Sequence, residues 1–170
     1  EVLRAQGIPV ELVPGITSAL AVPGGVGIPL THRKFASQVT VITGHEDPTK
    51  ADTSIHWPSL AKGIGTLVFF MGVKNLPHIT RNLVENGMAP DTPVGLVRWG
   101  TTTRQESVFG TLSNIVERVR AAGLKAPAII VVGKVVALRE TLKWFENRPL
   151  LGKRIVVTRA REQASDLVKR

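Results

Sequence analysis

Apolar runs of strand length alternate along this chain with segments of helical periodicity, and this alternation restricts the possible folds more than any other feature. Residues 66–71 and 128–132 are continuous apolar runs, which are typical of strands buried on both faces, and residues 94–99 form a further strand. Helices are expected over residues 75–87 and 113–123, because apolar residues recur there at helical spacing. The alternation predicts an α/β fold with a largely parallel or mixed sheet flanked by helices.

Shorter segments complete the expected secondary structure. Further strands are expected at residues 10–13, 38–43 and 107–111. Short helices are expected at residues 1–6, 17–22 and 140–146, the second of them broken by Pro23. Residues 45–63 are polar and contain two prolines, so a long loop with one short turn is expected there.

The segment after the first of these short strands carries a candidate site. The run ends at Pro14-Gly15, and Thr17 or Ser18 can then cap a helix of small residues. A strand that ends in a turn and opens a helix leaves backbone N–H groups free, and ligands of open α/β sheets bind at such a mouth. An ordinary strand-to-helix turn has the same residues, so the turn alone defines a place for a ligand and not a function.

The charge balance narrows the classes of partner. The chain has 22 Lys and Arg against 13 Asp and Glu, a formal net charge of +9 that favours a polyanion. Aromatic residues make up only 5%, and they are not interleaved with basic residues as a nucleic-acid platform requires. A small polycarboxylate fits the charge equally well, and nucleic acid is not the expected partner.

Several other classes of site are not expected. There is no cysteine, and none of the four histidines, His32, His45, His56 and His78, has the spacing of a metal-ligand motif, so no metal site is expected. The chain has no G-x-S-x-G hydrolase motif, no apolar run of about 18 residues and no signal-peptide pattern. These features predict no membrane partner and are compatible with a cytoplasmic location.

Two motifs stand in order at a defined spacing, V-P-G-I-T-S-A at residues 13–19 and G-I-P-L-T-H-R at residues 27–33. They resemble the middle of the uroporphyrinogen-III C-methyltransferases, in the tetrapyrrole methylase family. Further segments that match this family in order are residues 41–45, 66–73, 99–102, 110–112 and 126–133. The resemblance covers residues 1 to about 146. It implies methyl transfer from S-adenosyl-L-methionine to two ring carbons of uroporphyrinogen III, which gives precorrin-2 for sirohaem or cobalamin.

The resemblance also implies cofactor contacts at Thr17, Ser18, Met71, Gly100 and Ala128. Thr17 and Ser18 follow the Pro-Gly turn, where hydroxyl and N–H groups at a helix start suit a carboxylate or a ribose. Met71 would pack on the cofactor, Gly100 would leave room for the adenosyl group, and Ala128 would bond the adenine through its main chain. The alternatives are a helix cap, a core methionine, a tight turn and a packed strand.

Three residues are the candidate contacts for the substrate by the same resemblance. His32 and Arg33 lie at the family's crossing between two domains, and Arg104 follows the match at residues 99–102. Guanidinium groups bind carboxylates in a bidentate manner, and Arg98 is a further candidate for the eight carboxylates of the substrate. For each arginine taken singly, a solvated surface position is the alternative. No candidate for a general base is present, so no catalytic residue is assigned.

The expected domain organisation rests on two glycine-rich motifs that the family has and this sequence lacks. The glycine-rich motifs G-x-G-P-G-D and G-G-D-P of the family's N-terminal half are absent. Residues 1–30 are therefore expected to end an N-terminal methylase domain and cross to a C-terminal methylase domain at residues 31–146. Residues 147–170 resemble a linker and the truncated start of a uroporphyrinogen-III synthase, on a strand pattern at 151–159 and T-R-A-R-E-Q at 158–163. Such a chain is expected to be inactive alone, and its full-length form is expected to be a homodimer.

A function of another class stays open from the residues alone. A basic, non-catalytic α/β module that binds nucleic acid or a partner protein has the same composition. Oligonucleotide binding that weakens steeply with salt would favour such a module. Saturable binding of S-adenosylmethionine would favour the methylase.

Overall fold

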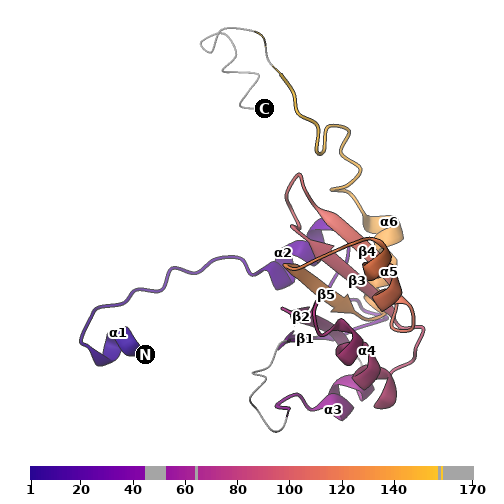
Figure 1. The fold of residues 1–170 in the computed structure, drawn as a ribbon, viewed down its shortest axis with the longest axis horizontal. Helices are drawn as coiled ribbons and strands as arrows, with labels where there is room; N and C mark the ends of the chain where they lie inside the picture. The colour runs from indigo at the N-terminus through magenta and orange to yellow at the C-terminus, as the bar shows by residue number, and fades with distance from the viewer. Residues whose placement is uncertain (45–52, 64, 157, 159–170) are drawn as a thin grey trace.

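A computed structural model of the chain describes residues 1–44, 53–63, 65–156 and 158. Figure 1 shows a sheet packed between helices, from which the two ends of the chain lead away. The N-terminal arm carries α1 (Val2–Ala5), which ends before Gly7 as the sequence predicts. Among the helices that the structure describes, none combines the length and the apolar character needed to cross a membrane.

Five strands form one mixed sheet in the order β1-β2-β5-β3-β4. They are β1 (Gln38–Thr43), β2 (Gly65–Phe70), β3 (Pro93–Arg98), β4 (Glu106–Thr111) and β5 (Ala128–Val132), all close to their expected bounds. β1 and β2 are parallel, β5 is antiparallel to its neighbours β2 and β3, and β4 is antiparallel to β3. β2 and β3 therefore end at the same edge of the sheet at which β5 begins.

Side chains alternate between the two faces of the sheet, and each face buries its own apolar cluster. On one face, Leu67 and Phe69 of β2 pack with α3 (Trp57–Lys62), α4 (Leu76–Glu85) and α5 (Ile115–Ala121). On the other face, Val68 of β2 packs with α2 (Ser18–Gly25) and the 3-10 helix η1 (Lys134–Leu138). The expected α/β class with a mixed, helix-flanked sheet is confirmed.

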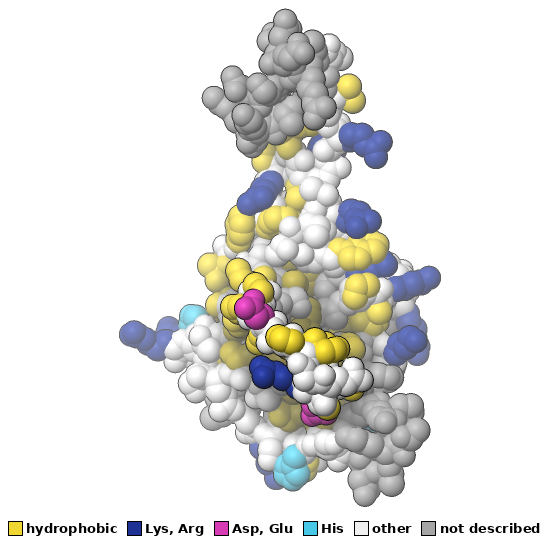
Figure 2. All heavy atoms as spheres, turned by 90° about the vertical axis from the view of Figure 1, so that its left-hand side faces the viewer, with side chains coloured by type: hydrophobic (Ala, Val, Ile, Leu, Met, Phe, Trp, Pro, Cys, Tyr) yellow, Lys and Arg dark blue, Asp and Glu magenta, His cyan; other side chains and the backbone are white. Residues whose placement is uncertain are grey.

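Two expected strands do not form in the described residues. Residues 10–13 belong to no ladder, and Leu12 and Val13 are 92% and 87% exposed. A strand forms only where its backbone groups find a partner, and the sheet places none beside this arm. Figure 2 views the molecule from the side of the arm and shows hydrophobic side chains exposed on that face. Residues 153–156 are also exposed and unpaired, and residues 157 and 159–170 lie outside the described residues.

Helix α2 begins where the sequence predicts, with Thr17 as its cap, but Pro23 does not end it. Proline has no backbone N–H group to donate, but its carbonyl can still accept a hydrogen bond. The carbonyl of Pro23 accepts from the N–H of Ile28 at 2.8 Å. Gly27, one residue earlier, has a φ of +77°, the left-handed conformation that commonly ends a helix. The helix therefore continues past the proline to Gly25.

The helix expected at residues 140–146 is displaced toward the N-terminus. It is observed as α6 (Arg139–Leu142), which directly follows η1. The chain leaves the helix because Glu146 accepts hydrogen bonds from Gln105 and Ser107 of the β3–β4 hairpin. In the expected loop over residues 45–63, positions 45–52 lie outside the described residues, and α3 forms more than the single turn expected.

Candidate functional site

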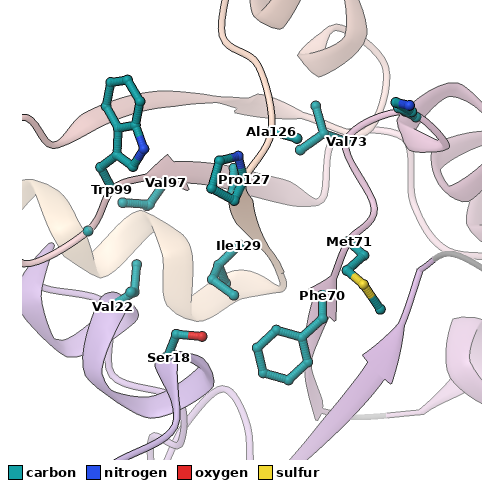
Figure 3. A pocket seen from close by; sticks show the side chains of 13 residues that line it. Ser18, Val22, Phe70, Met71, Val73, Val97, Trp99, Ala126, Pro127 and Ile129 are labelled. Atoms are coloured by element: carbon teal, nitrogen blue, oxygen red, sulfur yellow. The ribbon is translucent and has the colours of Figure 1, made fainter.

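A cavity of about 540 Å³ opens at the edge of the sheet where β2 and β3 end and β5 begins. Figure 3 shows side chains from α2, from the ends of β2 and β3 and from the start of β5 around this cavity. The lining residues are Ser18, Val22, Phe70, Met71, Val73, Lys74, Val97, Trp99, Gly100, Ala126, Pro127, Ala128 and Ile129. A concave, mostly apolar site of this size is typical of small-molecule and cofactor binding.

The start of α2 forms one wall of the cavity. The Thr17 hydroxyl oxygen accepts a hydrogen bond from the N–H of Ala19 at 3.3 Å, so Thr17 is the helix cap. Ser18 follows it and lines the cavity, and Val22 lies one turn further along the same wall (Figure 3). The cap thus positions the first turn of α2, and the following residues face the cavity.

Strained backbone marks the part of the lining that directly follows β2 and β3. Among the described residues, the non-glycine residues with positive φ are Met71 (+53°), Trp99 (+48°) and Thr101 (+66°). Met71 and Trp99 directly follow β2 and β3, and both line the cavity. Left-handed backbone costs about 1–2 kcal/mol per residue, and such residues gather at functional sites. The strain therefore supports a ligand-binding role for this wall.

Gly100 lines the cavity, but the structure gives it a packing role that the sequence did not reveal. A Cβ at position 100 would lie 2.5 Å from one methyl group of Val22 and 2.7 Å from the other. The absent side chain therefore makes room for α2. The predicted role of Gly100, to leave space for a bound ligand, stays a prediction beside this contact.

The structure brings together most of the residues predicted to hold a cofactor. Ser18, Met71, Gly100 and Ala128 all line the one cavity, although they come from four separate segments. Thr17 is adjacent, at the cap of α2. The predicted positions thus share a site with the dimensions of a small-molecule pocket.

The candidate substrate residues divide into two groups. Arg104 lies near the cavity, because its guanidinium carbon is 4.9 Å from the ring centre of the lining residue Trp99. Arg98 lies 3.6 Å from the same ring and forms an ion pair with Glu106 at 3.2 Å.

His32 and Arg33 lie elsewhere. The Thr66 hydroxyl donates to the carbonyl of Leu30 at 2.7 Å, which places this loop beside the start of β2. The cavity lies past the end of β2, about 16 Å further along the strand at about 3.3 Å per residue. The side chain of His32 stacks on Phe35 and its Nδ1 accepts from the N–H of Lys34 at 3.2 Å. The substrate contacts of His32 and Arg33 stay predictions.

Several lining residues were not among the predicted site residues. Val22 and Trp99 are the most informative of them. Val22 packs against Gly100, and the guanidinium groups of Arg98 and Arg104 lie over the ring of Trp99. Trp99 stands in the matched segment at residues 99–102, so that segment contained a usable signal. Phe70, Pro127 and Ile129 also stand in matched segments, at residues 66–73 and 126–133, but their exposure to a cavity depends on the sheet order.

The cavity suits binding of a partly apolar molecule more than it suits acid–base chemistry. Among the residues that the structure describes, the lining contains no carboxylate or imidazole, and Lys74 is the one charged side chain there. Within the described residues, no three His, Cys, Asp or Glu side chains gather closely enough to hold a metal ion; His45 lies outside those residues. The arrangement can orient a ligand and exclude water from it.

Comparisons with known proteins identify the family of this chain. Residues 1–116 match the family described as Tetrapyrrole (Corrin/Porphyrin) Methylases. A uroporphyrinogen-III C-methyltransferase of Bacillus subtilis is 46% identical over 157 residues, 92% of this chain and 32% of the relative. An S-adenosyl-L-methionine-dependent uroporphyrinogen III methyltransferase of Methanosarcina barkeri is 52% identical over 142 residues, 84% of this chain and 56% of the relative.

A solved structure shows the same architecture. The uroporphyrin-III C-methyl transferase of Thermus thermophilus, complexed with S-adenyl homocysteine, superimposes with a TM-score of 0.64 at 31% identity. The superposition covers 80% of this chain and 57% of that one. The chain therefore spans from about a third to just over half of the length of these relatives.

Proposed function

This chain belongs to the tetrapyrrole methylase family, and on that premise we propose that it forms part of an S-adenosyl-L-methionine-dependent uroporphyrinogen-III C-methyltransferase. One observation carries the proposal. Four positions predicted to contact the cofactor, Ser18, Met71, Gly100 and Ala128, line a single cavity at the ends of β2 and β3. A basic module without a ligand would have no reason to bring these positions together.

The residues of the cavity fit the proposed cofactor. Val22, Val97 and Ile129 form an apolar wall that suits an adenine ring, and Met71 is 62% exposed and free to pack on it. Ser18 and Lys74 bring a hydroxyl and an ammonium group, which suit a carboxylate. The bound cofactor supplies a methyl group that is already activated as a sulfonium. The chain is therefore required mainly to orient the reactants and to exclude water.

Uroporphyrinogen III is the proposed substrate, and Arg104 is its best-placed candidate contact. Arg104 is exposed and lies beside Trp99, so its guanidinium can reach a carboxylate at the rim of the cavity. His32 and Arg33 are proposed as contacts on the loop near the start of β2, reached by a substrate that extends beyond the cavity. No general base is assigned, since the lining offers none.

The finer organisation is also a proposal. We propose the division into residues 1–30, 31–146 and 147–170, with the last segment opening a uroporphyrinogen-III synthase domain. The Bacillus subtilis match is compatible with this division, because an alignment over 157 of the 170 residues must extend into residues 147–170. We further propose a cytoplasmic location, a homodimer at full length, and no methyl transfer by the 170-residue chain alone.

Calorimetric titration of the 170-residue chain with S-adenosyl-L-homocysteine tests the cofactor proposal. We expect saturable binding at one site per chain, because Ser18, Met71, Gly100 and Ala128 line one cavity. A parallel titration with an oligonucleotide at several salt concentrations tests the basic-module alternative. Oligonucleotide binding that weakens steeply with salt, without saturable cofactor binding, would overturn the proposal.

Met71→Ala should weaken S-adenosyl-L-homocysteine binding by about 1–2 kcal/mol, the value of one side chain buried by the ligand. Alanine retains the Cβ, so the strained backbone at φ +53° is the same in both proteins. Met88→Ala is the matched control, because Met88 packs on the opposite face of the sheet and not in the cavity. Equal affinity losses in the two variants would remove Met71 from the site.

Arg104→Ala should weaken equilibrium binding of uroporphyrinogen III by about threefold to tenfold, the effect expected for one charge-assisted contact at a rim. Affinity for S-adenosyl-L-homocysteine should change little. Arg120→Ala removes the same charge from the exposed surface of α5 and controls for the net charge. If both variants lose the same affinity, Arg104 acts only through the overall charge.

A further inference from the structure

The side chain of Gln105 connects two parts of the molecule that lie far apart in the sequence. Its carbonyl oxygen accepts from the backbone N–H of Thr101 at 2.9 Å. Its amide nitrogen donates to Oε1 of Glu146 at 3.1 Å. The N–H of Thr101 can only donate and a carboxylate can only accept, so one orientation of the amide satisfies both partners.

The Thr101 end of this bridge belongs to the cavity wall. Thr101 has a φ of +66° and follows the lining residues Trp99 and Gly100. Its methyl group also borders α2, since a Cβ at Gly25 would lie 3.1 Å from it. The hydrogen bond that Thr101 donates to Gln105 therefore holds a strained residue beside α2 and beside the lining residues Trp99 and Gly100.

The Glu146 end is firmly anchored. The same Oε1 accepts from the Ser107 hydroxyl at 2.9 Å, and the other carboxylate oxygen forms an ion pair with Arg139. The Arg139 guanidinium lies 4.0 Å from the ring centre of Phe109 on β4. The exposed fractions of the Arg139 and Glu146 side chains are only 11% and 24%, so this ion pair is shielded from water. Glu146 is thus a fixed point to which Gln105 can tether the loop.

We propose that Gln105 is a positioning residue, which with Glu146 holds Trp99 and Gly100 in the conformation that completes the cavity. The inference rests on the proposed function in one respect, that the cavity binds the adenosyl cofactor. Gln105 itself does not line the cavity and acts through the backbone of Thr101.

Gln105→Ala tests the bridge, with Ser107→Ala as its matched control. Both variants remove one hydrogen bond to the same carboxylate oxygen, but only Gln105 also reaches Thr101. We expect the Thr101 amide to exchange with solvent about tenfold faster in Gln105→Ala, measured by NMR, and S-adenosyl-L-homocysteine to bind about threefold to tenfold more weakly. Ser107→Ala should change neither quantity, even where its melting temperature falls equally.

A double variant separates positioning from general stability. Gln105→Glu alone places two carboxylates side by side, and it should weaken the binding of S-adenosyl-L-homocysteine more than Gln105→Ala does. Gln105→Glu combined with Glu146→Gln reverses the donor and acceptor at that contact and retains an acceptor for Thr101, so affinity should recover in part. Because Glu146→Gln by itself removes the ion pair with Arg139, recovery is measured as the coupling between the two substitutions, with Glu146→Gln as the fourth protein of the cycle. Unchanged Thr101 exchange in Gln105→Ala, equal affinity losses in Ser107→Ala, or additive affinity losses in this cycle would each overturn the proposal. If the unaltered chain binds no S-adenosyl-L-homocysteine, the cofactor proposal fails, while Thr101 exchange still decides whether Gln105 fixes the loop.

Discussion

Gly27→Ala is expected to lower the free energy of unfolding by about 3 kcal/mol or more. Gly27 has a φ of +77°, and left-handed backbone costs an alanine about 1–2 kcal/mol. Its Cβ would also lie 2.5 Å from the carbonyl carbon of Leu142 and from the backbone nitrogen of Lys143. Because these are backbone atoms, they cannot rotate away, and overpacking adds about 1–3 kcal/mol. Urea denaturation of both proteins measures the difference.

Gly123→Ala is the control for this loss. Gly123 has a φ of +64° with no atom within 4 Å of its missing Cβ, so it carries the backbone cost without the contact. We expect a loss of about 1–2 kcal/mol there. Equal losses at the two positions would contradict the contact between Gly27 and α6. The expected excess gives the G-I-P-L-T-H-R motif a structural reason, since its glycine docks the end of α2 against the end of α6.

Gly100→Ala should destabilise the chain by about 1–3 kcal/mol, because its Cβ would overlap the buried Val22 side chain. Val22→Ala removes both of the methyl groups that the Cβ would meet. In the double variant the two losses should therefore not add, and a coupling energy of about 1 kcal/mol or more is expected. Denaturation of the four proteins of the cycle measures it.

The ligand dependence of the same four proteins separates the two roles of Gly100. If the glycine serves only to admit α2, Gly100→Ala should cause no further loss of affinity for S-adenosyl-L-homocysteine in the Val22→Ala protein, which itself lacks part of the apolar wall. If it serves to admit the ligand, the affinity loss should persist in the double variant while stability recovers. If the stability losses of Gly100→Ala and Val22→Ala simply add in the double variant, the side chain introduced at position 100 does not contact Val22.

The regular elements could be predicted because local pattern decides them. Residues 67–71 and 128–132 are apolar throughout, and the structure places both runs in inner strands with neighbours on each side. The same local pattern failed for residues 10–13, since a strand needs a partner and pattern cannot supply one. Pro23 alone could not predict where α2 ends, because the helix continues past the proline and its end depends on the left-handed conformation of Gly27, four residues later.

The site was predictable only as positions and not as contacts. The resemblance placed Ser18, Met71 and Ala128 near one ligand, and the sheet order shows why these distant segments meet. The packing of Gly100 on Val22 and the bridge through Gln105 depend on how α2 and the β3–β4 hairpin sit on the sheet. Such tertiary contacts leave no periodic signal in a single sequence.

The position of β5 has a consequence for the order in which the molecule can assemble during synthesis. Among the strands that the structure describes, β5 comes last in the sequence but lies in the middle of the sheet, where it joins the β1–β2 pair to the β3–β4 pair. In the sheet, the β1–β2 pair and the β3–β4 pair form no hydrogen bonds with each other. The two pairs therefore stay unconnected in the nascent chain until residues 128–132 have left the ribosome. The cavity lies between the ends of the two strand pairs. Ala126, Pro127 and Ala128, which are among the last of its lining residues to be synthesised, form part of its wall. A ligand of the cavity would therefore bind only after residues 126–129 have been synthesised and β5 has paired with β2 and β3, so its binding would report that this sheet has formed.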